Sequence, residues 1–483
     1  MVPMLSVVVP IYNVEPYITE CLKSLATQTL EDLEVIMVDD GSTDGSRELA
    51  ESFAALDSRF TLICQPNQGP GPARNAGLRL AKGVYLAFAD ADDVVPSEAY
   101  ELLVGSLEQT GSDLACGGVR RIRDGELEES SLHEKPFRRT RPGTHILRKP
   151  SLTRDRTVWN KVYRMDFWHR HGLAFPSGIY EDVPVAMRAH VLADSVDVLA
   201  DVVYHWRRRD DDEGATSITQ HRAELDNLRE RLAAIRAVRD FLSEQAPDLI
   251  ETFDGLILEK DIVFLFQAIE AAKETRSLVE LGRELLEMLS PAVLASVSSL
   301  RRLELHLLER GMVPQLRRVR RFRRESVNGT KIVPRGLRTV NWYGDYPYFR
   351  SRRRLRIPDS VYDASAELKL LAKVEECTWT GSEFRIRAEV ALHRVTRRPD
   401  SVHLWLSDGR RKVPLEVRRA GRYGVVAAVD PRRLKGGGPN WRLNVRAETK
   451  GLVIKNVFTD GEGSRTWRLS VPGWSRSGMD MPQ

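Results

Sequence analysis

Short apolar runs alternate with amphipathic segments along the first 120 residues, and this alternation constrains the fold more than any other feature. In the segment after the first run, Ile18, Leu22 and Leu25 are spaced to share one helical face. Apolar runs separated by helices predict a parallel sheet covered on both faces, which is an α/β domain. Such sheets bind ligands at the carboxyl ends of their strands. The predicted strands are 5–10, 33–38, 60–64, 84–89 and 113–118.

The remaining sequence changes character twice. Residues 120–160 are polar and loop-rich, and residues 221–310 form amphipathic helical patterns. From about residue 355, short alternating strands broken by Gly, Pro and Asp predict a β-sandwich of the immunoglobulin type. Because 483 residues exceed a single ordinary core, we predict three domains. They are an α/β domain at 1–220, a helical subdomain with a basic arm at 221–325 and a C-terminal β-sandwich at 355–472.

Composition excludes several classes of protein. Apolar residues make up 42% of the chain, which is too many for global disorder. The four cysteines are scattered without a C-x-x-C pair, so a zinc ribbon is excluded and reduced thiols are expected. The sequence has no stretch of about 18 uncharged apolar residues, and no basic leader precedes the first apolar run. We therefore expect a cytoplasmic protein without a transmembrane helix.

Acidic residues gather where the fourth apolar run ends, since Asp90, Asp92 and Asp93 follow it almost at once. Carboxylates this close repel one another, so they either raise each other's pKa or recruit a cation. Oxygen ligands suit Mg²⁺ or Mn²⁺, which bind one or two carboxylates together with substrate phosphates. The alternative is capping of the helix that begins near Pro96, but one aspartate would satisfy a cap, which contributes about 1 kcal/mol. Three acids exceed that need, so we interpret the cluster as a metal site.

Polar and aromatic residues also follow the other predicted strands. A parallel sheet brings the ends of these strands to one edge, so the residues are expected to share a site with the acids. They are Pro10 and Tyr12 at the first strand, Asp39 and Asp40 at the second, and Asn67 and Arg74 after the third.

Four motifs, in this order and spacing, resemble those of glycosyltransferase family 2, whose members have the GT-A fold. They are VVVPIYN (7–13), VDDGSTDGS (38–46), NQGPGPARNAG (67–77) and FADADD (88–93). Three later segments resemble the enzymes that attach sugars to wall teichoic acid. These segments are WNKVYR (159–164), GIYEDV (178–183) and residues 204–219. The helical region followed by a β-sandwich is similar to the trimer-forming tail of those enzymes.

The resemblance implies a binding site for a UDP-sugar. Asp40 matches the acid that hydrogen-bonds the uracil ring. Pro10, Tyr12 and Asn67 match the wall of the base pocket, and Arg74 matches a contact to the base or the diphosphate.

The resemblance gives the acids separate roles. Asp90 would lie near the ribose and the donor sugar, and Asp92 would be the ligand of Mn²⁺ or Mg²⁺. Asp93 would face the donor sugar or the acceptor. Of the two adjacent acids in the second motif, Asp39 is expected to point away from the ligand and cap the next helix.

Sugar transfer with inversion needs a base for the acceptor hydroxyl and a Lewis acid for the departing diphosphate. The resemblance places the base in the Glu181–Asp182 pair and gives that role to Asp182. The alternative is that both acids merely begin a helix, where negative charge is favourable.

A charged segment at 206–219 matches the part of the family that closes over the diphosphate. Arg207 or Arg209 would pair with phosphate, and Ser217 would hydrogen-bond it. A solvated loop is the alternative. Related enzymes place a metal-binding histidine in this loop where this chain has Gly214, so we do not expect the loop to bind the metal.

The basic arm LRRVRRFRR (316–324) could bind an anionic polymer or acidic lipid head groups at the inner face of the plasma membrane. The alternative is a solvated end of an amphipathic helix. Nucleic acid is not expected as a partner, because no reading motif accompanies the charge. The β-sandwich predicts a homo-oligomer, with a trimer implied by the resemblance.

The sequence therefore predicts an inverting, metal-dependent glycosyltransferase. It would move a sugar from a UDP-sugar to an anionic polyol-phosphate polymer of the cell surface. Two alternatives remain open: a transferase for another capsule or exopolysaccharide acceptor, and a non-catalytic polymer-binding scaffold built on a GT-A module.

Overall fold

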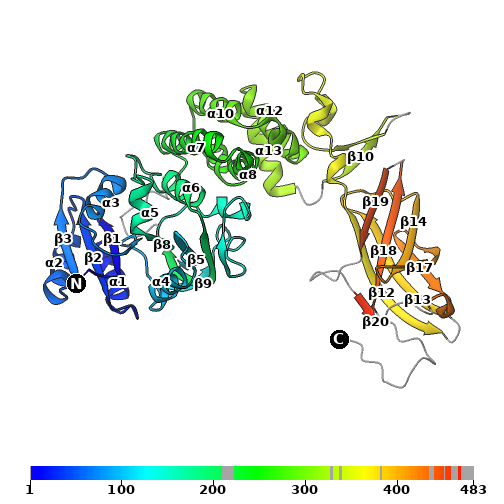
Figure 1. Cartoon of the computed structure of the whole chain (residues 1–483). Coiled ribbons are helices and arrows are strands. Elements are labelled where there is room, and N and C mark those ends of the chain that lie inside the picture. The colour runs from blue at the N-terminus through cyan, green and yellow to red at the C-terminus, as the bar shows by residue number, and fades with distance from the viewer. Residues whose placement is uncertain are drawn as a thin grey trace. The chain divides into compact units, whose positions relative to one another are not determined.

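The computed structural model describes residues 2–123, 125–208, 222–326, 330–336, 340–380, 383–434, 440–450, 452–457 and 466–468. The chain divides into two compact units, Met1–Leu294 and Ala295–Gln483 (Figure 1). Each unit contains its own cluster of buried apolar side chains. Within the described ranges, no helix has the length and apolar character needed to cross a membrane.

One mixed sheet organises the first unit. Its strands are β1 (Leu5–Ile11), β2 (Leu33–Asp39), β3 (Phe60–Cys64), β4 (Tyr85–Phe88), β5 (Leu114–Arg123), β6 (Glu126–Glu129), β7 (Arg141–Thr144), β8 (Lys161–Arg164) and β9 (Val196–Arg207). They lie in the order β3-β2-β1-β4-β8-β5-β9-β7, with β6 paired to β5. The strands from β3 to β4 are parallel, whereas β8 is antiparallel to both of its neighbours.

Helices cover both faces of this sheet. They are α1 (Glu15–Ala26), α2 (Ser46–Leu56), α3 (Pro70–Leu78), α4 (Ala99–Thr110), α5 (Met165–Arg170) and α6 (Asp182–Leu192). Side chains alternate across a strand, so Val7 of β1 packs in one cluster with Ile18 and Leu22 of α1. Val8 points to the other face, where a Cβ added to Gly77 of α3 would lie 2.4 Å from Val8 Cγ1. The α3 helix therefore rests directly on the sheet.

The strand order places a ligand site at the ends of β1 and β4. The chain runs outward from β1 through β2 to β3, and then returns to add β4 on the other side of β1. In open α/β sheets, ligands bind at the carboxyl ends of the strands where the order reverses in this way. The residues that follow β1, β2 and β4 lie at this edge.

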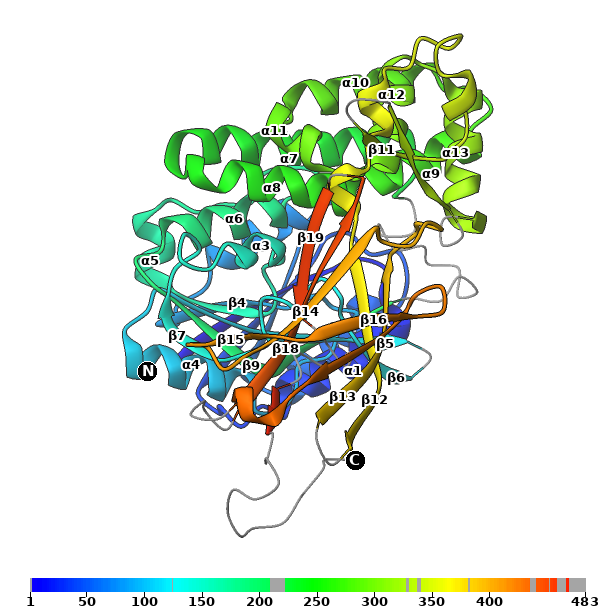
Figure 2. The same ribbon diagram turned by 90° about the vertical axis from the view of Figure 1, so that its right-hand side faces the viewer.

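A group of helices completes the first unit. They are α7 (Leu225–Gln245), α8 (Ile250–Leu256), α9 (Ile262–Ala271) and α10 (Arg276–Met288). A π-helical turn, η3 (Ile257–Asp261), joins α8 to α9. The α7 helix buries residues at helical spacing, including Leu228, Leu232 and Ile235. It packs against α6, and Figure 2 shows the two helices side by side.

The second unit begins with helices. After α11 (Pro291–Ser296), which spans the boundary, come α12 (Ser299–Glu309), α13 (Val313–Ser326) and a hairpin of β10 (Ile332–Arg335) and β11 (Asn341–Gly344). Glu304 of α12 is fully buried and forms ion pairs with Arg301, Arg320 and Arg323. This cluster fixes α13, which contains the basic arm, against α12.

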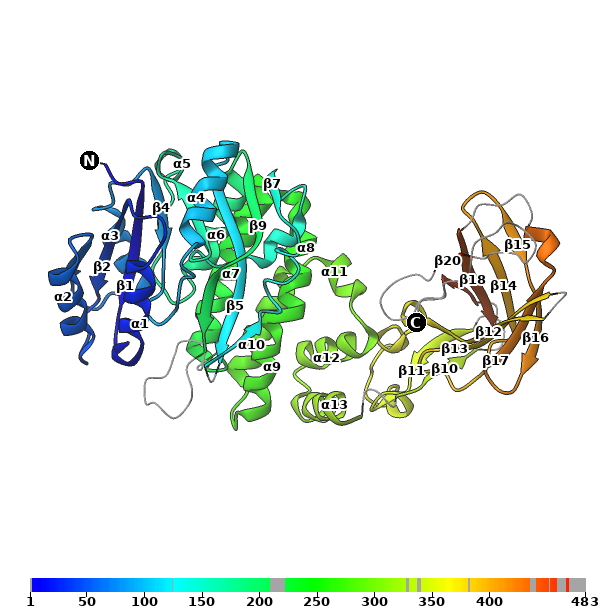
Figure 3. The ribbon, with the colours of Figure 1, turned by 90° about the horizontal axis from the view of Figure 1, so that it is seen from below.

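Two antiparallel sheets form the rest of the second unit, and they face each other in Figure 3. The first contains β12 (Leu370–Thr380), β13 (Glu383–Leu392), β17 (Gly424–Val429) and β16 (Glu416–Ala420). The second contains β15 (Lys412–Pro414), β14 (Ser401–Ser407), β18 (Asn440–Thr449), β19 (Leu452–Val457) and β20 (Thr466–Arg468). Alternate side chains from both sheets fill the core between them.

The predicted fold class is confirmed, since an α/β sheet domain is followed by helices and a β-sandwich. The sequence analysis did not predict β8 or β9, and β8 separates the strand at 114–123 from β4. The division into three domains stays a prediction. In the structure, α7 to α10 belong to the same compact unit as the α/β sheet.

Replacing Glu304 with Gln should destabilise the second unit by about 3–5 kcal/mol, because it leaves buried arginine charge without its partner. Glu309→Gln provides the matched control, since this residue is exposed on the same helix. Chemical unfolding would measure both variants. Equal stabilities would show that the arginine cluster does not depend on the Glu304 charge.

Candidate active site

A tight turn after β4 gathers the three predicted acids. The backbone N–H of Asp93 donates to the carbonyl of Asp90 at 3.1 Å, which folds residues 90–93 into one turn. Asp90 and Asp92 are partly exposed, whereas Asp93 is only 2% exposed. Asp93 Oδ1 accepts a hydrogen bond from the N–H of Arg207 at 2.7 Å, but its Oδ2 has no hydrogen-bond partner among the described residues.

This turn fits a divalent cation. Burial, together with the negative charges of Asp92 and Asp90, raises the pKa of Asp93 well above its ordinary value. The carboxylates of Asp90 and Asp92, both partly exposed in this turn, are oxygen donors of the kind that Mg²⁺ and Mn²⁺ prefer.

A buried arginine links these acids to the predicted base. Arg74 of α3 is 4% exposed, and its guanidinium donates to Asp90 Oδ1 at 2.5 Å and to Glu181. Burial disfavours the charge of Arg74, but Asp90 and Glu181 hold its pKa above the ordinary value. The guanidinium also lies over the ring of Phe175, 5.4 Å from the centroid. Arg74 therefore joins the end of β4 to the segment that precedes α6.

The predicted base begins α6. Glu181 is buried against Arg74, and Asp182 is the first residue of the helix and is partly exposed. Burial, followed by the negative charge of Glu181, raises the pKa of Asp182 to about 7. A carboxyl group with this pKa can exist as a base at neutral pH and accept a proton.

The two adjacent acids after β2 have different partners. Asp39 is fully buried and binds Arg47 of α2 at 2.5 Å. Asp40 accepts hydrogen bonds from the side chain of Gln65 at 2.8 Å and from the N–H groups of Gln68 and Gly69 at 2.9 and 2.8 Å. Asp40 therefore closes the loop that contains the third motif.

The other residues predicted for the base pocket differ in exposure. Tyr12 is 47% exposed after β1, Asn67 is exposed, and Pro10 is partly exposed. Gly41 has φ +77°, and a Cβ added there would lie 3.0 Å from the backbone nitrogen of Asn67. The second and third motifs are thus in close contact, as the parallel sheet led us to expect.

Arg207 ends β9 beside the acids. Its Nε donates to the carbonyl of Asp92 at 2.8 Å, its guanidinium binds Glu20 at 2.5 Å, and it lies over the ring of Tyr17. In this structure the side chain holds the acidic turn. Arg209 and Ser217, which were also predicted as donor-binding residues, and Gly214 lie outside the described residues.

Sequence reasoning missed two polar contributions. The hydroxyl of Tyr204 accepts a hydrogen bond from the N–H of Asp90 at 2.9 Å, on a strand that was not predicted. Lys161 of the WNKVYR segment is fully buried, and its Nζ lies 2.7 Å from Asp155 Oδ2. The same oxygen lies 2.9 Å from His190 Nε2. Cys116, Asp155 and His190 have metal-binding atom types close together, but the lysine already balances the aspartate charge.

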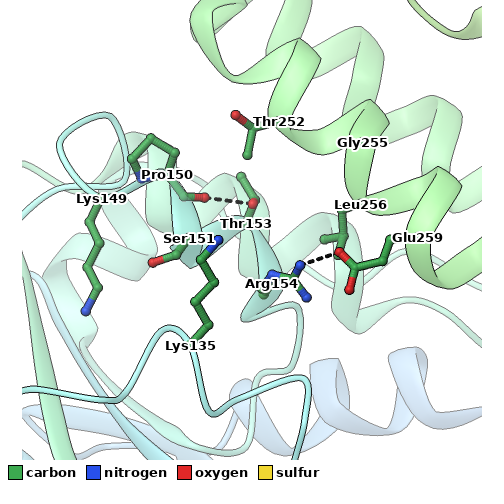
Figure 4. A pocket seen from close by; sticks show the side chains of 10 residues that line it. All are labelled: Lys135, Lys149, Pro150, Ser151, Thr153, Arg154, Thr252, Gly255, Leu256 and Glu259. Carbon is green, nitrogen blue, oxygen red and sulfur yellow. Dashed lines mark hydrogen bonds and ion pairs between the residues drawn. The ribbon is translucent and has the colours of Figure 1, made fainter. Parts of the chain in front are cut away.

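A separate cavity of about 600 Å³ lies between the loop before β8 and the α8–η3 segment (Figure 4). Glu259 at its rim is paired with Arg154. The cavity is lined by none of the predicted site residues, so it is distinct from the cluster around Arg74. Its lining residues are Lys135, Lys149, Pro150, Ser151, Thr153, Arg154, Thr252, Gly255, Leu256 and Glu259.

Part of the chain that includes the acidic turn is similar to a known protein family. Residues 6–171 match the family model described as glycosyl transferase family 2. This stretch of the chain is therefore similar to the glycosyltransferases of family 2. The match covers β1 to β4 with their acidic turn, and it ends within the segment that follows α5.

Curated relatives match less than half of the chain. The uncharacterized glycosyltransferase EpsJ of Bacillus subtilis is 36% identical over 220 residues, which cover 43% of this chain and 62% of EpsJ. The poly(ribitol-phosphate) beta-glucosyltransferase of Bacillus spizizenii is 31% identical over 219 residues, which cover 43% of this chain and 33% of that enzyme. The similarity to these relatives therefore spans less than two thirds of their length.

Solved structures extend the likeness of fold to the remaining chain. Staphylococcus aureus TarS matches with a TM-score of 0.59 at 18% identity, covering 93% of this chain and 77% of TarS. A shorter form of TarS in complex with UDP-GlcNAc matches with a TM-score of 0.56 at 21% identity, covering 70% of this chain and 96% of that one. At these identities the likeness establishes the fold alone, a GT-A domain followed by helices and a β-sandwich.

Replacing Arg74 with Met should destabilise the first unit by about 3–5 kcal/mol at pH 8, because Asp90 and Glu181 lose their buried counter-charge. The loss should be smaller at pH 5.5. The pKa of Glu181 in the folded state is already raised, and removing Arg74 raises it further. The variant therefore keeps its stability below the pKa that Glu181 has in the unfolded chain. It loses stability as the pH rises through the pKa of Glu181 in the folded state.

Urea unfolding at both pH values would test this prediction. Arg170→Met is the control, because its partner Asp166 is exposed. If Arg74→Met lost the same free energy of unfolding at both pH values, the charge balance around Arg74 would be contradicted.

Proposed function

We propose that this chain is an inverting, divalent-metal-dependent glycosyltransferase that uses a UDP-sugar. The observation that carries the proposal is the Arg74 bridge, which connects the acidic turn after β4 to Glu181. The next residue, Asp182, is a carboxyl group with a pKa of about 7. Such a pair of sites is what inverting transfer needs, with a base on one side and a stabilised leaving group on the other. The family 2 domain and the glycosyltransferase relatives support this activity.

The donor assignment rests on the base pocket and on the likeness to TarS, which was solved with UDP and with UDP-GlcNAc. Pro10, Tyr12 and Asn67 would enclose the uracil ring. A carboxylate has about four acceptor positions, and Asp40 uses three for described residues, so one remains for the ring N–H. Asp40 would thus recognise uridine while it holds the loop.

The cation would be Mn²⁺ or Mg²⁺, held by Asp92 at the turn after β4. When bound, it would supply positive charge to the diphosphate leaving group. Asp90 would lie near the ribose and donor sugar, and Asp93 would face the sugar or the acceptor. Arg207 would support this turn through the Asp92 carbonyl, and Arg209 and Ser217 would contact the diphosphate.

Asp182 would accept the proton of the acceptor hydroxyl as that oxygen attacks the anomeric carbon from the face opposite the diphosphate. Glu181 and Arg74 would hold the start of α6 so that the Asp182 carboxylate faces the acceptor. A positioned base contributes about 10²- to 10⁴-fold to the rate.

The acceptor would be an anionic polyol-phosphate polymer. Relatives named as poly(ribitol-phosphate) transferases support this class. The basic arm on α13 supports it as well. In this arm Leu316 and Val319 are buried, and two of the arginines pair with Glu304. Arg318 of the arm stacks on Tyr348, which lies next to the basic segment 350–356. The exposed arginines of this surface are Arg318, Arg321, Arg324, Arg350, Arg353, Arg354 and Arg356.

Arginine binds phosphate through paired hydrogen bonds, so this surface would suit the phosphodiesters of a polymer or the acidic head groups at the inner membrane face. The β-sandwich would also form a homo-oligomer, for which a trimer is the leading arrangement. Two exposed apolar side chains, Leu371 of β12 and Val453 of β19, are available to such an interface.

UDP with Mn²⁺ should raise the melting temperature of the wild type, since a ligand at 100 times its Kd stabilises by about 2.7 kcal/mol. The metal-dependent part of this shift should disappear in Asp92→Asn and on addition of a chelator. GDP and CDP serve as controls for the base pocket. If no nucleotide produced a shift, the donor site would be refuted and a polymer-binding scaffold would become the better explanation.

Asp182→Asn should lower kcat by about 10²- to 10⁴-fold while the UDP-induced melting shift is retained. In the wild type, kcat should rise with pH through about 7, because only the deprotonated carboxylate can accept a proton. Asp166→Asn, an exposed residue of α5, is the control. Undiminished turnover in Asp182→Asn would exclude this residue as the base.

A further inference from the structure

The helices after the sheet domain contact the residue that precedes the Glu181–Asp182 pair. The hydroxyl of Tyr180 donates to Asn227 Oδ1 at 2.5 Å and accepts a hydrogen bond from Arg231 Nη2 at 2.7 Å. The guanidinium of Arg231 also lies over the Tyr180 ring, 4.3 Å from its centroid. Both partners belong to α7, so this helix fixes the hydroxyl and the ring of Tyr180 together.

Arg231 is itself held by a buried acid. Its Nη1 donates to Asp261 Oδ1 at 2.6 Å, and Asp261 Oδ2 accepts from Arg156 Nη1 at 3.0 Å. Asp261 is buried at the end of the π-helical turn η3. Burial opposes its charge, but the two arginines hold the pKa of Asp261 below its ordinary value, so the acid stays ionised. A π-helical turn within a longer helix often marks a functional position.

The segment before α6 approaches two helices closely. Gly178 has φ +114°, and a Cβ added there would lie 2.5 Å from Glu230 Oε2 of α7. A Cβ added to Gly71 of α3 would lie 2.2 Å from the carbonyl oxygen of Pro176. The segment therefore lies against α3, which also carries Arg74, and against α7.

We propose that Tyr180, Arg231 and Asp261 form a positioning relay for Asp182, an inference that rests on the proposed function. Arg74 fixes Glu181 from the sheet domain, and the relay fixes Tyr180 from the helical segment. Asp182 begins α6 directly after these two anchored residues, so its carboxylate is oriented by both. A displacement of about 1 Å in a reacting group can cost on the order of 100-fold in rate, so a relay that prevents it contributes to transfer without touching substrate.

The relay extends the functional site into a region that carries no predicted donor or metal residue. Its members act through Asp182, and they are positioning residues. Their loss should therefore lower kcat and leave the binding of UDP and the KM for the UDP-sugar unchanged.

Tyr180→Phe is the sharpest test, because it removes the hydroxyl and keeps the ring on which Arg231 lies. We expect kcat to fall about 10- to 100-fold with an unchanged KM for the UDP-sugar. Asp261→Asn should give a similar fall, and the double variant should be no slower than the slower single variant, since both act through one element. The matched control is Glu259→Gln. Glu259 lies in the same η3 turn as Asp261, but it pairs with Arg154 and is not a member of the relay.

Combination with the base variant separates positioning from other roles. In an Asp182→Asn background, Tyr180→Phe should cause no further loss, because there is no carboxylate left to position. Melting temperatures of all variants would show that each is folded. Wild-type kcat in Tyr180→Phe, or an equal fall in the Asp182→Asn background, would overturn the relay.

The two proposals fail in different ways. If the wild type transfers no sugar from any UDP-sugar, the proposed function fails and the relay fails with it. If the wild type is active but Asp182→Asn is fully active too, Asp182 is not the base, and the relay fails while the transferase activity stands. If the wild type is active, Asp182→Asn is inactive and Tyr180→Phe is normal, only the relay is overturned.

Discussion

The candidate site depends on one buried ion triad. Arg74 is almost inaccessible to solvent, and its charge is sustained by Asp90 from the end of β4 and by Glu181, which lies 107 positions away in the sequence. Arg74 and Glu181 are buried, so either charge would be unfavourable without the other, and the partly exposed Asp90 adds a second negative charge beside Arg74. The consequence is geometric, because the acidic turn and the start of α6 cannot move apart without separating these charges. The α3 helix that supplies Arg74 is fixed in turn by close contact of Gly77 with Val8.

Charge balance around Arg74 also sets the chemistry. One guanidinium faces Asp90, Glu181 and the nearby Asp182, so negative charge is in excess. Burial and the excess negative charge together raise the pKa of Asp182. Burial and the negative charges of Asp92 and Asp90 likewise raise the pKa of Asp93. One carboxyl group is thereby poised to exchange a proton near neutral pH, and the other lies in a turn suited to a cation. Two aspartates thus have raised pKa values for the same reasons at two places in the candidate site.

The sequence revealed those parts of the site that depend on local pattern. Apolar runs predicted β1 to β4, and the acids at their ends were expected to meet because parallel strands share an edge. Two kinds of feature could not be predicted in this way. The strand β8 is four residues long and contains Lys161, which reads as a surface residue until the buried Asp155 is known. The link between Tyr180 and Arg231 joins residues 51 positions apart on different elements, so no local pattern reveals it.

The pKa of Asp182 bears on the two interpretations of Glu181 and Asp182. If these acids only began a helix, the helix dipole would favour their charged forms and lower their pKa values. That effect is about 0.3–1 kcal/mol, which is less than one pKa unit of about 1.4 kcal/mol. Instead, burial and Glu181 raise the pKa of Asp182 from 3.8 to about 7, so the environment outweighs the dipole in the opposite direction. A fold that needed only a helix start would leave this carboxylate in water. Here it lies near Arg74 and Glu181 in surroundings that disfavour its charged form, which is what a group that accepts a proton near neutral pH would require.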